Sequence, residues 1–187
     1  VPSTDTIEPH EAAEALIAAT GADIRIGGDR AFYNWKEDYV AMPDRERFYG
    51  TDTSSPTDAW YATKLHELAH WTGHTSRLNR VTCMTARGSD EYAREELVAE
   101  LASWFVSAET GLPFDPSQHA AYINSWLLAL KKDKNEIFRA ASAASKATGY
   151  LLQVKADDGW RWRSSTRRTD EGAGACEVVL VDAIEVL

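Results

Sequence analysis

The sequence predicts an α+β fold in which a small, mostly antiparallel sheet packs on a bundle of helices. Short β-rich runs lie between residues 23 and 42, separated by glycines or charged turns, and apolar residues recur at helical spacing from about residue 59 to residue 152. The chain has 187 residues, two cysteines and a formal net charge of −9. This length buries a core without disulfide bonds, and the acidic charge disfavours binding of polyanions over the whole surface.

The first 42 residues predict one helix followed by the sheet. Apolar positions at helical spacing indicate a helix over residues 8–19, which Gly21 closes. The β-rich runs that follow are separated by Gly27-Gly28 and by a charged turn at residues 36–38. We expect these runs to form the strands of the sheet: residues 23–26, 31–35 and 39–42.

The middle of the chain is predicted to be helical. A helix over residues 59–72 is expected to begin at a Thr57 or Asp58 cap and to end at Gly73. The further helices are expected over residues 90–110, from near Ser117, and after Asp133. Beyond residue 152 the pattern changes to expected strands around a Gly-rich, charged loop. We therefore expect a main domain at residues 8–152 and a β-rich extension of unknown role at 153–187.

The motif His66-Glu67-Leu68-Ala69-His70 indicates a metal site on the helix over residues 59–72. Two imidazoles four residues apart lie on one face of a helix, so both can bind one ion. Glu67 follows His66 around the helix, where it is placed to act on a metal-bound water. We expect the His face to line a cleft and the opposite face to pack in the core through Tyr61, Leu65, Leu68 and Thr72.

A third ligand is needed, because hydrolytic zinc sites commonly use three protein ligands and leave one position open. The metzincin spacing would place a third histidine where this chain has Ser76, so that pattern is excluded. On the next helix, Glu96 and Glu100 share a face with Ser103. We favour Glu96 as the ligand and Glu100 as the partner that orients a ligand imidazole, over the reverse assignment.

The two faces of the helix over residues 90–110 are expected to differ. Its core face is predicted to carry Val98, Leu101 and Phe105. The alternative explanation for its glutamates is a solvated acidic face, since several more lie on the same helix: Glu91, Glu95 and Glu109.

These residues together predict peptide hydrolysis. A Zn²⁺ bound by His66, His70 and Glu96 lowers the pKa of its bound water and polarises a carbonyl group. Glu67 would take the proton of that water and pass it to the leaving amine. His119 and Tyr122, three residues apart, are candidates to stabilise the oxyanion, with packing at the edge of the core as the alternative role for both.

Four blocks of the sequence, in order, resemble the metallopeptidase domain of ArdC-type antirestriction proteins. The first block lies within residues 11–42 and contains ATGADIR and GGDRAFY. The others begin at His66, Arg94 and His119 and read HELAHWTGHTSRL, REELVAEL and HAAYINSWLLALKKDK. The resemblance covers about residues 8–152.

This resemblance implies a zincin-like fold with the HExxH helix at the cleft and a role in plasmids, phages or other mobile elements. The family's metal motif falls on His66, Glu67 and His70, and its acidic helix on Glu96 and Glu100. A protein or peptide substrate, such as a component of host restriction or defence, is the implied partner. Family members usually carry a separate domain that binds single-stranded DNA, so we assign no nucleic-acid-binding residues to this chain.

Two other functions are compatible with parts of the sequence. A non-enzymatic antirestriction module could use its acidic surface to mimic DNA, although such a protein has no need of a convergent metal site. A structural zinc site is disfavoured, because Cys83 and Cys176 do not form the closed, Cys-rich pattern of such sites. Neither a signal peptide nor a membrane-spanning run is expected, which predicts a cytoplasmic protein that does not contact membranes.

Overall fold

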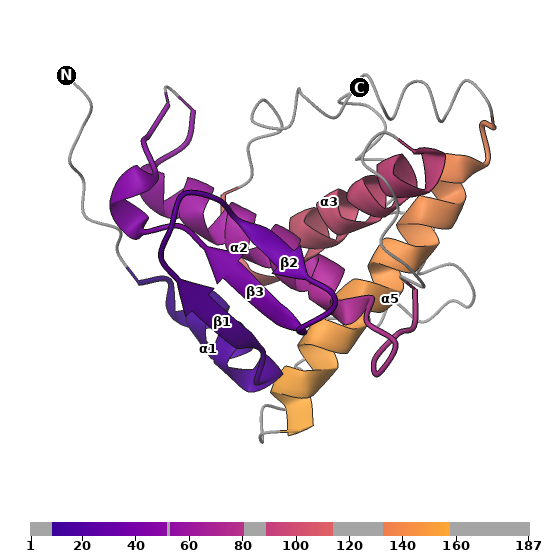
Figure 1. Ribbon diagram of the computed structural model, residues 1–187, viewed down its shortest axis with the longest axis horizontal. Helices are drawn as coiled ribbons and strands as arrows, with labels where there is room; N and C mark the ends of the chain where they lie inside the picture. Colours follow the sequence, from indigo (N-terminus) through magenta and orange to yellow (C-terminus); the bar gives the residue numbers. More distant parts are fainter. Residues whose placement is uncertain (1–8, 52, 81–88, 114–132, 158–187) are drawn as a thin grey trace, which may run out of the picture.

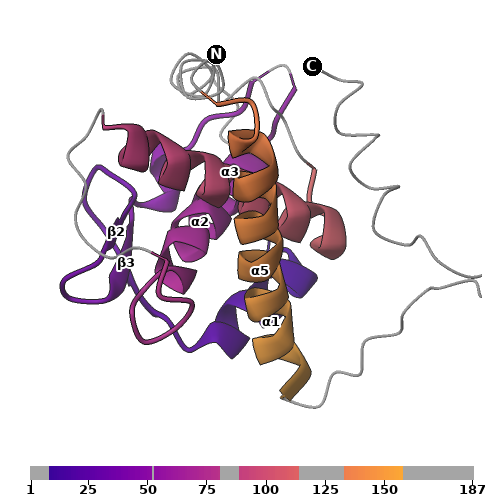
Figure 2. The same ribbon diagram turned by 90° about the vertical axis from the view of Figure 1, so that its right-hand side faces the viewer.

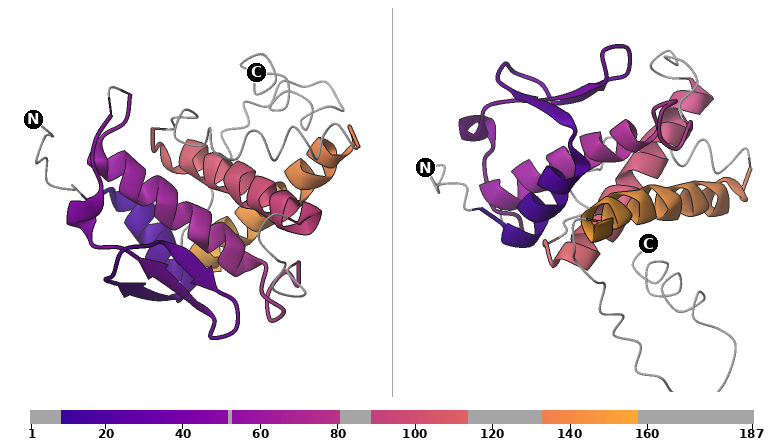
Figure 3. Two further views of the ribbon diagram at one scale, coloured as in Figure 1. Left: turned by 45° about the horizontal axis from the view of Figure 1, so that its top comes forward. Right: turned by 90° about the horizontal axis from the view of Figure 1, so that it is seen from below.

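A computed structural model describes residues 9–51, 53–80, 89–113 and 133–157. In this part of the chain a small sheet lies along one side of helix α2, and helices α3 and α5 cover its other side (Figures 1 and 3). The arrangement confirms the predicted α+β fold. The elements, in order, are α1 (Glu11–Thr20), β1 (Asp23–Ile26), β2 (Phe32–Asn34), β3 (Tyr39–Met42), the 3₁₀ turn η1 (Arg45–Arg47), α2 (Pro56–Thr72), α3 (Asp90–Thr110) and α5 (Glu136–Asp157).

The sheet is mixed, which corrects the expectation of a mostly antiparallel one. Strand β3 lies in the middle, paired antiparallel with β2 and parallel with β1. Within this sheet, only β2 and β3 form a hairpin, and Asp38 in the turn between them has a positive φ of 54°. Gly27 and Gly28, both at positive φ, redirect the chain after β1, so β3 inserts between the other two strands.

Helix α2 begins earlier than the sequence analysis predicted. Its cap is Ser55, whose hydroxyl accepts from the backbone N–H of Asp58 at 3.1 Å, while the Asp58 carboxylate accepts from the backbone N–H of Ser55. This reciprocal pair satisfies two N–H groups of the first turn, and Pro56 fits the first helical position because it lacks an N–H. The predicted cap at Thr57 or Asp58 is therefore wrong.

The core confirms one predicted helix face completely and another in part. The predicted apolar face of α2 is completely buried: Tyr61, Leu65, Leu68 and Thr72. On α3, Val98 is buried as predicted, but Leu101 and Phe105 are only partly buried against the core. The opposite face is buried as well, through Glu96, Glu100 and Ser103. The reason is that α3 packs against both α2 and α5, so Glu96 and Glu100 face His66 of α2 instead of solvent.

Helix α5 runs across α2 and α3 (Figure 2) and continues to Asp157, past the expected domain boundary at residue 152. Small buried residues allow this close approach: Ala140, Ala144 and Ala147. The predicted helix from Ser117, with His119 and Tyr122, and the expected strands beyond residue 160 lie outside the described residues. None of the described helices is long and apolar enough to span a membrane.

Candidate metal centre

Helices α2 and α3 bring three potential ligands together. The two Nε2 atoms of His66 and His70 are 3.2 Å apart. The Glu96 carboxylate lies beside both atoms, with Oε2 3.4 Å from His66 Nε2 and Oε1 3.6 Å from His70 Nε2. Metal–ligand bonds of zinc length in tetrahedral geometry place neighbouring ligand atoms about 3.3 to 3.6 Å apart. Each of the three separations is close to this spacing, and one ligand atom from each residue lies within 4.8 Å of the other two.

The chemistry of these side chains also fits a cation. Glu96 is buried, and its Oε2 forms no hydrogen bond within the described part of the chain, although His66 Nε2 approaches it at 3.4 Å. A buried carboxylate oxygen without a hydrogen bond is costly, and a bound cation removes that cost. Further carboxylates surround the two imidazoles: Glu67, Glu95 and Glu100. The surroundings of the two imidazoles therefore carry an excess of negative charge, which favours a bound cation.

The first imidazole is contacted by carboxylates of α3. His66 Nδ1 lies 3.0 Å from Oε2 of Glu100, which is completely buried. The other oxygen of Glu100 accepts a hydrogen bond from Trp104 Nε1 at 2.7 Å. Because Nδ1 is engaged in this way, the Nε2 of His66 points toward Glu96 and His70. Glu100 thus occupies the position in which we expected an orienting partner.

The second imidazole has a support that the sequence analysis missed. His70 Nδ1 lies 3.3 Å from Oε1 of Glu95, and both oxygens of Glu95 accept hydrogen bonds from Arg80. Among the sequence expectations, Glu95 appears only in support of the alternative of a solvated acidic face, and Arg80 has no role. The adjacent pair Glu95-Glu96 was the available signal, because neighbouring helix positions differ by about 100° and can serve two different histidines.

Glu67 lies between the two histidines in the sequence and is 9% exposed. Burial lowers the pKa of His66, but its close contacts with the carboxylates of Glu100 and Glu96 and the charge of Glu67 outweigh it and raise this pKa from 6.5 to about 10. Without a metal, a proton on His66 therefore balances part of the carboxylate charge. Metal binding has to displace that proton, because an imidazole ligand is neutral.

The segment that follows α2 attaches the sheet to the end of this helix. Arg77 donates to the backbone oxygen of Trp71 at 2.6 Å and forms an ion pair with Asp38 in the turn before β3. Tyr33 of β2 donates to Asp38 at 2.7 Å and accepts from Arg77 at 3.1 Å. These contacts fix the β2–β3 hairpin relative to the helix that carries both histidines.

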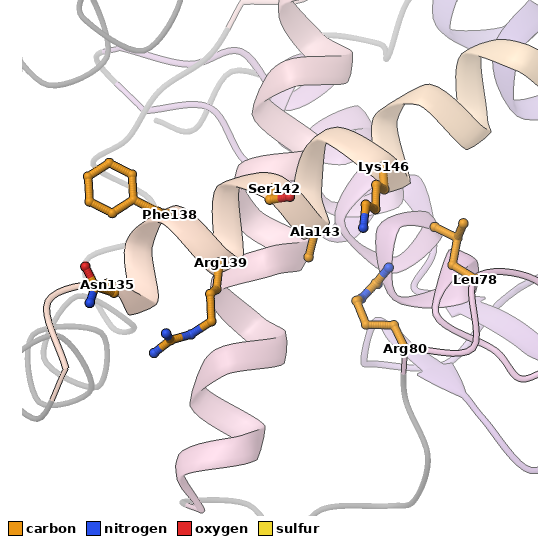
Figure 4. A pocket seen from close by; sticks show the side chains of 8 residues that line it. All are labelled: Leu78, Arg80, Asn135, Phe138, Arg139, Ser142, Ala143 and Lys146. Carbon is orange, nitrogen blue, oxygen red and sulfur yellow. The ribbon is translucent and has the colours of Figure 1, made fainter. Parts of the chain in front are cut away.

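A groove of about 510 Å³ lies between this segment and α5 (Figure 4). Leu78 and Arg80 line one side, and the face of α5 that contains Phe138, Arg139 and Lys146 lines the other. Both guanidinium groups are already paired, Arg80 with Glu95 and Arg139 with carboxylates at the start of α5. The groove therefore offers far less free positive charge than the number of basic side chains lining it suggests.

Residues 11–143 match a family model described as a zincin-like metallopeptidase, MPTase-PolyVal. The chain belongs to this zincin-like family. The match includes both histidines of the metal centre and the acidic helix α3. The predicted zincin-like fold and the resemblance to ArdC-type proteins are confirmed by this match and by the solved structures described below.

Sequence relatives place this zincin-like domain in larger proteins. The chain is 49% identical over 143 residues to the DNA primase TraC of Escherichia coli, which is 76% of this chain but 13% of the primase. It is 37% identical over 159 residues to the uncharacterized protein y4eC of Sinorhizobium fredii, covering 84% of this chain and 49% of that protein. The chain thus spans half or less of these relatives.

Crystal structures of the antirestriction protein ArdC from plasmid R388 have the same fold as this zincin-like domain. The Mn(II)-bound structure aligns with a TM-score of 0.70 at 42% identity, covering 83% of this chain and 56% of ArdC. The metal-free structure aligns with a TM-score of 0.68 at 41% identity, covering 83% and 54%. The family and the Mn(II)-bound relative both indicate a centre for a divalent metal.

Proposed function

We propose that this chain is a zinc-dependent metallopeptidase domain of the antirestriction type. In this proposal His66, His70 and Glu96 hold the metal, and Glu67 is the general base. The observation that carries the proposal is the convergence of His66, His70 and Glu96, which each offer one ligand atom within 4.8 Å of the others. Two imidazoles and one carboxylate form the ligand set of zinc peptidases that leave a fourth position open.

Zinc is favoured over other divalent ions by the type of donor. Mg²⁺, Ca²⁺ and Mn²⁺ prefer sites rich in oxygen ligands, whereas two of the three ligands here are imidazole nitrogens. When bound, the metal lowers the pKa of water in its open position and polarises the substrate carbonyl. Metal content measured after isolation without added chelator distinguishes zinc from manganese.

The protein contributes proton transfer and a fixed geometry. Glu67, 9% exposed beside the ligands, accepts a proton from the attacking water and returns it to the leaving amine. Glu100 and Trp104 hold His66 so that its Nε2 stays directed at the metal position. His119 and Tyr122 remain the proposed oxyanion donors, and their placement lies outside the described residues.

The names of the relatives suggest the biological setting of this activity. ArdC is an antirestriction protein of a plasmid, and TraC is a DNA primase. We propose that the domain acts in the cytoplasm on a protein component of host restriction or defence. A purely acidic DNA mimic is less well supported, since carboxylates that such a mimic would display are paired with arginines: Asp23 with Arg25, Asp38 with Arg77 and Glu95 with Arg80.

The decisive experiment compares Glu67→Gln with the unchanged protein on a proteome-derived peptide library. We expect the variant to keep its zinc and to lose at least about 100-fold in cleavage rate, because general base catalysis contributes that much. Glu109→Gln, an exposed change on α3, is the matched control and should leave both quantities unchanged. Cleavage that survives in Glu67→Gln, or a zinc-loaded protein that cleaves nothing, would refute the proposal.

A further inference from the structure

Arg80 holds the carboxylate that contacts the second histidine. Its Nε donates to Glu95 Oε2 at 2.9 Å, and its Nη2 donates to Glu95 Oε1 at 2.8 Å. The same Oε1 lies 3.3 Å from His70 Nδ1. A guanidinium group that bonds both oxygens fixes the plane of a carboxylate, which a single donor cannot do.

Arg80 is itself attached to the helical turn that carries His70. Its guanidinium donates to the backbone oxygen of Ala69 at 2.8 Å and to the Thr72 hydroxyl at 3.2 Å. Its backbone N–H donates to the oxygen of Gly73 at 3.0 Å. One side chain therefore connects the last turn of α2 to Glu95 of α3, and its positive charge suits the C-terminal end of a helix.

We infer that Arg80 is a positioning residue of the metal centre, acting through Glu95 on His70. The inference rests on the proposed role of His66, His70 and Glu96 as metal ligands. Without Arg80, Glu95 would lose the two bonds that fix it while it still repels the neighbouring carboxylate of Glu96. The His70 ring would then lose its fixed orientation, and its Nε2 would point less well at the metal position.

Arg77 provides a matched control at the same end of α2. It is 8% exposed, donates to the oxygen of Trp71 at 2.6 Å and pairs with a carboxylate, as Arg80 does. Its partner is Asp38 in the sheet, and none of its described contacts involves the metal centre. Loss of Arg77 therefore reports on the stability of this end of the helix without disturbing Glu95.

The groove beside α5 offers a second control, because Arg80 also lines it (Figure 4). Replacing Arg80 by alanine leaves a space between this groove and Glu95. Free guanidinium ion has the charge and the fork of donors that Glu95 would then lack. At concentrations far below those that unfold the protein, guanidinium should therefore restore the position of Glu95 in Arg80→Ala.

The experiment measures zinc affinity by competition with a coloured chelator, together with the visible spectrum of the Co²⁺-loaded protein. We expect Arg80→Ala to bind zinc about tenfold more weakly, Arg80→Lys to recover only part of this loss, and guanidinium to restore the alanine variant. Arg77→Lys should bind zinc within about twofold of the unchanged protein. The cobalt spectrum should shift only in the Arg80 variants.

Glu95→Gln covers the case in which Arg80→Ala fails to fold, since it keeps the size of the side chain. It should weaken zinc binding to a similar degree, and Arg80→Lys combined with Glu95→Gln should be no worse than Glu95→Gln alone. Unchanged zinc affinity in the Arg80 variants, or an equal loss in Arg77→Lys, would overturn the inference. Because the readout is metal affinity, a protein that binds zinc but cleaves nothing would refute the proposed peptidase and leave this inference intact.

Discussion

The two histidines of the proposed metal centre have supports of different origin. His66 is held by Glu100, which Trp104 holds in turn, and both of these residues lie on one helix. His70 is held by Glu95, whose position depends on Arg80 from the segment after α2. The first support needs only the spacing of α3 and its packing on α2. The second also requires the correct path of a loop, so it is the part of the site that a change outside the helices can disturb.

Replacing a proposed metal ligand, rather than a residue that positions one, should have the largest effect on metal binding. We expect Glu96→Ala and His66→Ala each to weaken zinc binding by more than about 100-fold, because changes in outer partners alone cost about 10- to 100-fold. Zinc content and competitive titration test this prediction. Full occupancy in Glu96→Ala would transfer the ligand role to Glu100.

Changing one supporting carboxylate at a time should separate the two histidines. Glu100 is completely enclosed, whereas the side chain of Glu95 is 17% exposed. We therefore expect Glu100→Gln to weaken zinc binding more than Glu95→Gln, with both losses between about 10- and 100-fold. Parallel zinc titrations of the two variants measure the difference. A larger loss in Glu95→Gln would show that the loop supplies the stronger support.

Trp104→Phe removes a hydrogen bond from Glu100, which holds His66. We expect this change to lower the stability of the protein more than its metal affinity. The change removes the Nε1 donor from the buried Glu100 carboxylate, and hydrogen bonds to charged groups contribute about 1.5 to 3 kcal/mol. We expect the free energy of unfolding of the metal-free protein to fall by an amount in this range. Denaturant titration followed by circular dichroism measures it, and an unchanged midpoint would contradict the prediction.

The smallest effect is expected at the Asp38–Arg77 pair, which holds the same segment as Arg80 but lies outside the metal centre. Burial raises the pKa of Asp38, but hydrogen bonds from Arg77 and Tyr33 outweigh it and lower this pKa below 3.8. A carboxyl whose pKa is lower in the folded protein contributes stability above its ordinary pKa and loses it as the pH falls through the folded value. The Asp38 contribution should therefore be present at pH 7, begin to fall near pH 4 and be lost as the pH falls through the still lower pKa of the folded protein.

Asp38→Asn tests this contribution. At pH 7 the loss should be at most about 1 kcal/mol, because the Asp38 side chain is 35% exposed and solvent screens the pair. The difference between the variant and the unchanged protein should shrink steadily as the pH falls below about 4. Denaturant midpoints across pH 3 to 7 measure this, and zinc affinity should stay constant near neutral pH. A drop in zinc affinity would mean that the whole segment, and not Arg80 alone, positions His70.

Elements that depend on interactions between nearby residues could be predicted from the sequence more accurately than features that depend on tertiary contacts. Helix α3 and strands β1 and β3 were predicted with the bounds that the structure shows, because capping residues and periodic apolar positions act within a few residues. On α3 the predicted core face is confirmed for Val98 and holds only in part for Leu101 and Phe105, which are partly buried. Periodicity reports which side of a helix is apolar, but on α3 the side with the glutamates that face α2 is buried as well.

The sequence by itself determined the elements that depend on local spacing, above all the placement of His66 and His70 on one face of a helix. It also limited the third ligand to the glutamates of α3. Only the tertiary structure decided which carboxylate serves which atom, placing Glu96 at both Nε2 atoms, Glu100 at His66 and Glu95 with Arg80 at His70. The physical reason is that side chains on one helix are fixed by its 3.6-residue repeat, whereas contacts between α2, α3 and the segment after α2 depend on how all three pack.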